Sequence, residues 1–193
     1  VGGFGSYQGY YDAFVAKLSA DGSSMVFSSL IGGSDLDVAH SVAIDSSDDI
    51  FIAGETQSAD YPMVTPFQGT YQGGLLDGFC TKLNSTGGTL LYSTYLGGAN
   101  TDCALGVSVD YTGSVYITGY TESPGFPVAS QIQSYRGNRD AFVCRLSNSG
   151  ASMLFGTFLG GTEEDQGAGV VAIDDGCVYV AGTTYSTDFP TAN

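Results

Sequence analysis

Residues 106–121 read GVSVDYTGSVYITGYT, and this stretch decides which fold we expect for the chain. Two short runs rich in β-branched and aromatic residues, 107–109 and 115–118, flank the polar segment 110–113. Runs of this kind on either side of a tight turn predict a β-hairpin. Related hairpins occur earlier as SVAIDSSDDIFIAGET from Ser41 and later as VVAIDDGCVYVAGTT from Val170. The chain therefore contains one unit written three times.

Four landmarks recur in the same order in every copy of this unit. They are Asp-x-Phe beginning at Asp12, Asp77 and Asp140; a Gly pair at 32–33, 97–98 and 160–161; a strand-ending glycine at Gly54, Gly119 and Gly182; and aromatic-Pro at 61–62, 126–127 and 189–190. Each series is spaced by 65 and then 63 residues. Because all four keep one register, we interpret them as a structural repeat.

Each copy contains four predicted strands, which in the first copy are residues 14–18, 25–31, 41–44 and 50–54. A single four-stranded sheet cannot cover both of its faces, whereas copies stacked around an axis cover one another. The sequence therefore predicts an all-β fold, a β-propeller with blades of four antiparallel strands.

The repeat resembles the bacterial β-propeller repeat family abbreviated SBBP. The residues that carry the resemblance are Asp12-AFVAKL, Leu91-YSTYLGG, Val109-DYTGSVYITGYT and Asp188-FPT. Such repeats sit in large secreted or surface proteins that share no common chemistry. The resemblance thus implies a propeller at an extracellular or cell-surface location and does not imply an enzyme.

The predicted blades divide the chain unevenly. We expect an outer half-blade at 12–32, full blades at 40–98 and 105–161, and an inner half-blade at 168–184. This is too little to close a ring, because propellers have four or more blades. Two hypotheses follow: the complementary half-blades of separate copies join head to tail into a ring or fibre, or the sequence is an excerpt of a larger surface protein.

The charge of the chain argues against two classes of partner. The formal net charge is −15, with only five Lys plus Arg. A nucleic-acid-binding protein needs a basic surface, and anionic membranes attract basic segments. No apolar run is long enough to insert into a bilayer. We therefore expect neither nucleic-acid binding nor membrane insertion, while a cation would be attracted.

One aspartate falls at the same position after each Gly pair: Asp37, Asp102 and Asp165. Carboxylates beside the carbonyls of Gly-rich links could hold Ca²⁺, which takes six to eight oxygen ligands. The alternative, which we favour, is that each aspartate accepts hydrogen bonds from loop amides and stabilises a turn.

Aromatic and basic residues of the long loops form the candidate binding surface for a protein or a glycan. They are Tyr61, Phe67, Tyr71, Phe126, Tyr135, Arg136 and Arg139. Aromatics on loops of one face resemble a protein-binding patch. The alternative is that the aromatic rings fold the loops down onto the blades, and the faithful repetition of the aromatic-Pro pairs favours it.

The remaining candidates for chemistry are four cysteines and one histidine. Cys80, Cys103, Cys144 and Cys177 lack the C-x-x-C spacing of a zinc or redox site. They are either disulfide candidates or small buried hydrophobes. His40 precedes a predicted strand without a nucleophile in its segment, so we interpret it as structural. We expect a non-enzymatic structural or assembly module.

Overall fold

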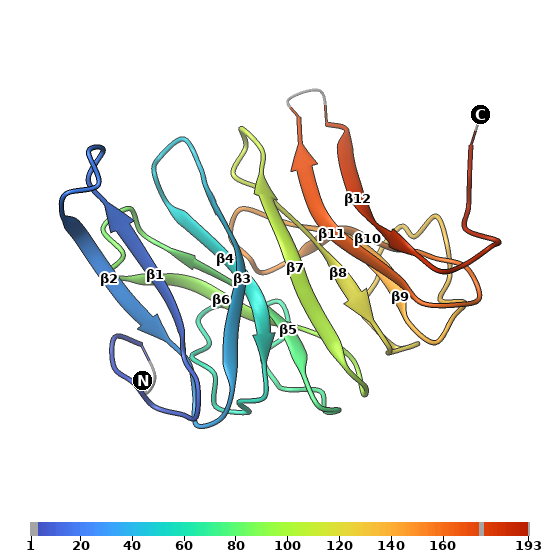
Figure 1. The fold of residues 1–193 in the computed structure, drawn as a ribbon, viewed down its shortest axis with the longest axis horizontal. Coiled ribbons are helices and arrows are strands. Elements are labelled where there is room, and N and C mark those ends of the chain that lie inside the picture. Colours follow the sequence, from blue (N-terminus) through green and yellow to red (C-terminus); the bar gives the residue numbers. More distant parts are fainter. Residues whose placement is uncertain (1–3, 174–175, 193) are drawn as a thin grey trace.

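The computed structural model describes residues 4–173 and 176–192. All regular secondary structure in these residues is β-strand, arranged in four antiparallel sheets that lie side by side in a row (Figure 1). The prediction of an all-β, blade-based propeller fold is confirmed. No helix with the length and apolar character needed to cross a bilayer occurs among the described residues.

Two of the four sheets are complete and have four strands each. The first runs in the order β3 (Asp37–Ile44), β4 (Ile50–Thr56), β5 (Asp77–Leu83) and β6 (Leu90–Leu96). The second repeats this order with β7 (Asp102–Val109), β8 (Val115–Thr121), β9 (Asp140–Leu146) and β10 (Met153–Leu159).

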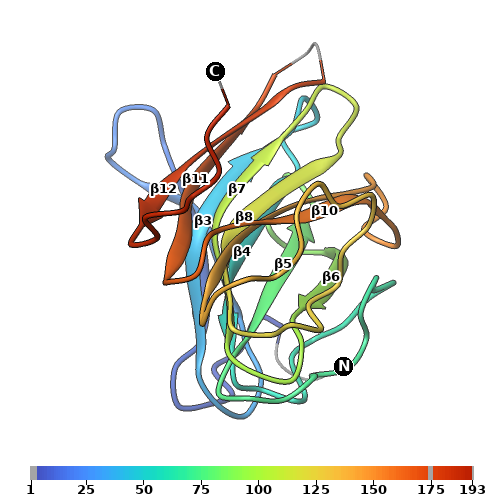
Figure 2. The ribbon, with the colours of Figure 1, turned by 90° about the vertical axis from the view of Figure 1, so that its right-hand side faces the viewer.

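A two-stranded sheet lies at each end of the row. At one end, β1 (Ala13–Leu18) pairs with β2 (Met25–Ile31). At the other end, β11 (Asp165–Ala172) pairs with β12 (Val178–Thr184). Figure 2 looks at this second end, where β11 and β12 face the viewer. By their place in the repeat, β1 and β2 correspond to the outer strands β5 and β6, while β11 and β12 correspond to the inner strands β3 and β4.

The first strand of each full sheet begins earlier than the sequence predicted. β3 begins at Asp37, not at residue 41, because a β-bulge between Ala39 and Ser41 lets the pairing with β4 continue past His40. The same bulge recurs in β7 and β11. It brings a backbone carbonyl against the repeated strand-ending glycine: a Cβ on Gly119 would collide with the carbonyl oxygen of Cys103.

The hydrophobic core lies between neighbouring sheets. Successive residues of a strand point to opposite faces, and β4 is buried on both. Ile50 and Ile52 pack in the cluster shared with β1 and β2, whereas Phe51 and Ala53 pack in the cluster shared with the second full sheet. Each full sheet is therefore stabilised by its neighbours on both sides.

Candidate functional site

The two ends of the row differ sharply from the full sheets in exposure. Phe14 of β1 is 68% exposed, whereas its counterparts Phe79 and Phe142 are fully buried. Tyr179 of β12 is 64% exposed, whereas its counterpart Tyr116 is fully buried. Exposed apolar side chains continue along both end sheets: Leu18, Met25, Val26 and Val171. Each end thus presents an open strand edge together with an uncovered apolar face.

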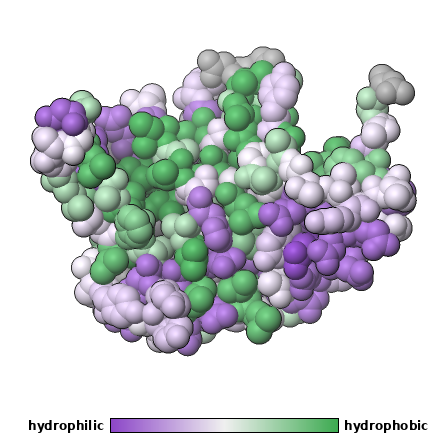
Figure 3. Space-filling model, viewed as in Figure 1, coloured by the Kyte–Doolittle hydropathy of each residue, from purple (hydrophilic) through white to green (hydrophobic). Residues whose placement is uncertain are grey.

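The exposed apolar surface is continuous over part of the molecule. Figure 3 shows hydrophobic surface over the upper part of β1 and the neighbouring β3. The exposed side chains of β3 there are Val42 and Ile44. Contiguous apolar surface of this kind marks interaction sites more often than isolated exposed residues do.

We call the place where one sheet passes into the next a junction. At each junction a buried aspartate is the first residue of the next sheet: Asp37 of β3, Asp102 of β7 and Asp165 of β11. One oxygen, Oδ2, accepts hydrogen bonds from a glycine amide at 2.7 Å and from a serine hydroxyl at 2.8–2.9 Å. The donors are Gly33 and Ser58, Gly98 and Ser123, and Gly161 and Ser186. These bonds are of the loop-stabilising type.

A second aspartate lies near the first at each junction: Asp12 near Asp37, Asp77 near Asp102, and Asp140 near Asp165. A Cβ on Gly32 would lie 2.7 Å from Asp12 Oδ1 and 2.8 Å from Asp37 Oδ2, so only glycine fits between the two carboxyl groups. In the middle junction, burial and then the charge of Asp102 raise the pKa of Asp77 to about 7. Burial raises the pKa of Asp102 to about 6. The carboxyl groups of Asp77 and Asp102 therefore hold their protons more tightly than exposed aspartates do.

The three predicted calcium ligands are not brought together. Asp37, Asp102 and Asp165 begin strands of three different sheets, and one carboxylate oxygen, Oδ1, of each is buried without a hydrogen-bond partner. Calcium binding at these junctions stays a prediction.

A basic residue recurs at one place in each copy of the repeat, as Lys17, Lys82 and Arg145, and in the full blades it pairs with aspartates. Lys82 Nζ lies 3.1 Å from Asp45 Oδ2 and 3.2 Å from Asp49 Oδ2, and Arg145 lies 2.7 Å from Asp110. All three carboxylates belong to the hairpin turn between the two inner strands of the same sheet. Lys17, at the equivalent place in β1, makes no ion pair with the described residues.

The predicted loop aromatics are folded onto the sheets. Tyr61 is 2% exposed and stacks on Phe79 with ring centroids 4.7 Å apart; Phe126 is 3% exposed and lies 4.4 Å from Phe142. The other three are half-buried and pack against the same cores: Phe67, Tyr71 and Tyr135. These rings anchor the long loops to the sheets.

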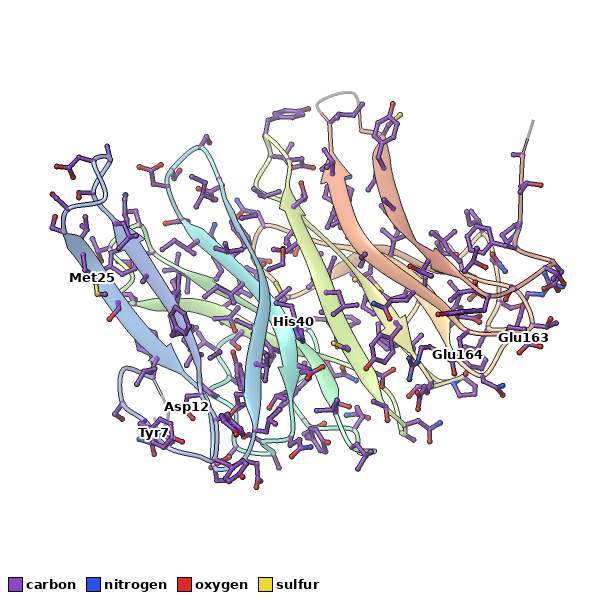
Figure 4. The ribbon with its side chains drawn as sticks, viewed as in Figure 1. Tyr7, Asp12, Met25, His40, Glu163 and Glu164 are labelled. Atoms are coloured by element: carbon purple, nitrogen blue, oxygen red, sulfur yellow. The ribbon has the colours of Figure 1, made fainter. Side chains whose placement is uncertain are left out.

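The two predicted arginines lie where loops meet neighbouring strands. Arg139 donates to Glu122 at 2.7 Å, lies 3.7 Å from Glu164, and covers the ring of Tyr120. Arg136 is more exposed and lies 3.8 Å from Asp188. Glu164 lies at the base of the β11–β12 end in Figure 4. Arg139 therefore makes its contacts within the protein.

The cysteines do not share one environment. Cys80, Cys103 and Cys144 are free and buried, whereas Cys177 is exposed. Cys80 and Cys144 lie in the core between the full sheets, as expected for small buried hydrophobes. Cys103 instead donates a hydrogen bond from Sγ to Glu55 Oε2 at 2.8 Å. Neither of the two interpretations of the cysteines predicted this contact.

His40 completes a cluster that sequence reasoning missed. Its Nε2 lies 3.3 Å from the same Glu55 Oε2 that Cys103 contacts. His40 is the bulge residue of β3, Glu55 is on β4, and Cys103 is on β7 of the next sheet. In Figure 4, His40 lies at the centre of the molecule. The cluster joins different copies of the repeat, so no local motif reveals it.

Comparison with known proteins agrees with the repeat. A family model described as SBBP, beta-propeller repeat, matches residues 26–62 and 91–127. Both matches end on the proline of an aromatic-Pro pair. No curated protein matches the chain.

Proposed function

Because the chain carries SBBP beta-propeller repeats, we propose that it is a structural assembly module with no enzymatic activity, which associates with further copies of itself. In this proposal β12 of one copy pairs with β1 of another. The inner half-blade and the outer half-blade then complete a four-stranded blade. A surface or extracellular setting fits such a module and is part of the proposal.

The proposal rests on the difference in burial between the end strands and their counterparts in the full blades. β5, β8 and β9 are almost wholly buried, whereas β1 and β12 are largely exposed. Phe14 and Tyr179 are large exposed side chains that would gain from a neighbour, since burying such a side chain stabilises by about 1.5–3 kcal/mol. A free edge also offers unpaired backbone donors and acceptors.

The full blades give the expected register of the new pair. In them Ile117 pairs with Cys144, and Ile52 pairs with Thr81. The equivalent residues at the two ends are Val180 of β12 and Ala16 of β1. The proposed contact therefore places Val180 of one copy opposite Ala16 of the next, in an antiparallel pair.

One ion pair of the full blades would not be reproduced in the joined blade. Lys82 and Arg145 each pair with an aspartate in the inner hairpin turn of their own blade. In the hairpin of β11 and β12, Ile173 occupies the place of Asp45 and Asp110. The completed blade would therefore not give Lys17 the aspartate that its counterparts have, and the proposal does not rest on this contact.

The same contact can produce two assemblies. Two copies that complete each other's ends would close a ring of six blades, from two full blades per copy and two joined ones. If the rotation between copies does not close, the contact repeats as a fibre. Either outcome satisfies the proposal.

Disulfide trapping tests the proposed register directly. One preparation carries Ala16→Cys and the other carries Val180→Cys, both in a Cys177→Ser background. Directly opposed residues in an antiparallel pair have Cβ atoms about 4.5–5.5 Å apart, so mild oxidation of the mixture should give a covalent heterodimer.

The matched control replaces Val180→Cys by Ala181→Cys. Ala181 is the next residue on the strand and points to the opposite face of the sheet, so it should not crosslink to residue 16. A dimer with the first pair and not with the second supports the register. Failure of the first pair, or equal crosslinking by both, overturns it and favours completion of the blades by other means, such as further repeats of a longer chain.

A further inference from the structure

We propose that His40, Glu55 and Cys103 form a binding site for a thiophilic divalent cation of the Zn²⁺ class, which joins the two full sheets. This inference is independent of the proposed assembly. A nitrogen, an oxygen and a sulfur ligand are the donor types that zinc sites use. Their candidate ligand atoms all lie within 4.8 Å of one another.

The distances are close to what a tetrahedral ion requires. Zn–N and Zn–O bonds of about 2.0–2.2 Å put two tetrahedral ligand atoms roughly 3.3–3.5 Å apart. His40 Nε2 and Glu55 Oε2 are already 3.3 Å apart. Cys103 Sγ is 2.8 Å from Glu55 Oε2, the distance of a hydrogen bond, and would move outward by less than about 1 Å when the ion replaces the thiol proton.

Binding would release the thiol proton of Cys103 to solvent, because a thiol coordinates a cation as the thiolate.

The site is reachable from solvent. The His40 side chain is 29% exposed and lies at the edge of an open cavity of about 430 Å³ between β1 and β3. Three protein ligands leave a fourth position, which water fills in zinc sites of this kind. Cys103 provides the buried end of the site at 1% exposure.

The repeat supplies an internal comparison. At the next junction, Leu105 replaces His40, Tyr120 replaces Glu55, and Gln166 replaces Cys103. Structural residues of this fold recur in every copy, as the junction aspartates do. The three cluster residues occur in one junction only, which points to a role beyond holding the blades together.

Titration with Co²⁺ and then Zn²⁺ tests the site in tag-free protein. We expect one Co²⁺ per chain, a thiolate-to-cobalt charge-transfer band in the near ultraviolet, and loss of the band when Zn²⁺ displaces Co²⁺. His40 is the only histidine, so its ring resonances in NMR should also shift with Zn²⁺.

Repeat-matched variants decide the outcome. His40→Leu introduces the residue type found at the equivalent position of the next copy, Leu105. Cys103→Val introduces the residue type found at the equivalent position of the first copy, Val38. Each should weaken Zn²⁺ binding at least tenfold, and Cys103→Val should abolish the charge-transfer band, whereas Cys177→Ser should change neither. Circular dichroism checks folding, and Glu55→Gln replaces Cys103→Val if the latter does not fold. The proposal is overturned if the wild type gives no band, or if all ligand variants bind as the wild type does.

Discussion

Gly119 shows how the repeat constrains single residues. It lies in β8, two residues before the strand ends at Thr121, opposite the bulge of β7, where the carbonyl oxygen of Cys103 occupies the space of a side chain. The same approach recurs at Gly54 and Gly182, against the carbonyls of Val38 and Gln166. The strand-ending glycine is therefore a steric requirement of the bulge.

Gly119→Ala should lower the free energy of unfolding by about 1–3 kcal/mol, because the strand must move to admit the methyl group. Gly125→Ala is the matched control: it lies in the following loop with nothing within 4 Å of its added Cβ, so its effect should stay within about 0.5 kcal/mol. Urea denaturation measures both. Equal stability of the two variants contradicts the steric account.

Asp77 makes the stability of the protein depend on pH. Its pKa is raised to about 7 by burial, against about 3.9 in an unfolded chain. Below about pH 4 both states are protonated and the carboxyl costs the fold nothing. Between pH 4 and 7 the unfolded chain loses the proton first, so the free energy of unfolding should fall by on the order of 2–4 kcal/mol.

The variant Asp77→Asn stays neutral over the whole range and should flatten this part of the pH profile. Asp102 remains in the variant, and its pKa of about 6 leaves a smaller slope of the same sign. Denaturant midpoints measured at intervals from pH 4 to pH 8 check the prediction. Parallel profiles for the variant and the wild type would show that Asp77 does not hold the proton.

At the scale of elements, the same sequence position behaves differently in a half-blade and in a full blade. Phe14 and Phe142 share one place in the repeat, yet Phe14 is 68% exposed and Phe142 is buried. The difference follows from the missing inner strands beside β1. A strand of this protein is therefore well buried where further strands and a neighbouring sheet surround it.

Phe142→Ala should therefore destabilise the fold by about 3–5 kcal/mol, as truncation of a buried aromatic does. Phe14→Ala should change the stability of the separated chain by less than about 0.5 kcal/mol and should weaken association instead. Thermal denaturation at low concentration and sedimentation at high concentration separate the two effects. A loss of stability for Phe14→Ala comparable with that for Phe142→Ala refutes the distinction.

The strands themselves could be predicted from the sequence, but the start of β3 could not. Alternating β-branched and aromatic runs and the turn residues located all four strands of the first copy. β3 begins earlier than predicted because Asp37 is polar yet buried, with its carboxylate bonded to Gly33 and Ser58. From sequence alone, a polar residue at the start of a strand cannot be told from a loop residue, because its buried hydrogen-bond partners are not known.

The candidate site was less predictable than the fold. The loop aromatics repeat, and repetition correctly favoured packing against the blades for Tyr61 and Phe126. The cluster of His40, Glu55 and Cys103 depends on a bulge and on the contact of two sheets. Pattern reasoning within one copy cannot place three such residues together, although their failure to repeat was a visible signal.

At the scale of the whole molecule, the row of sheets ends in two complementary halves. β1 and β2 lie at one end, and β11 and β12 at the other, so the ends do not pair within one chain (Figure 1). Each lacks the half that the other has. The head-to-tail association that we propose would cover both with the kind of contact that the protein already uses between β4 and β5.

The molar mass in solution, measured by light scattering across a concentration series, tests the proposed association. We expect a mass of at least twice 19.9 kDa, either a discrete dimer for a ring or a rising distribution for a fibre. We also expect Phe14→Ala to shift the distribution toward the monomer. A single species of 19.9 kDa at all concentrations, with the end sheets folded, contradicts it.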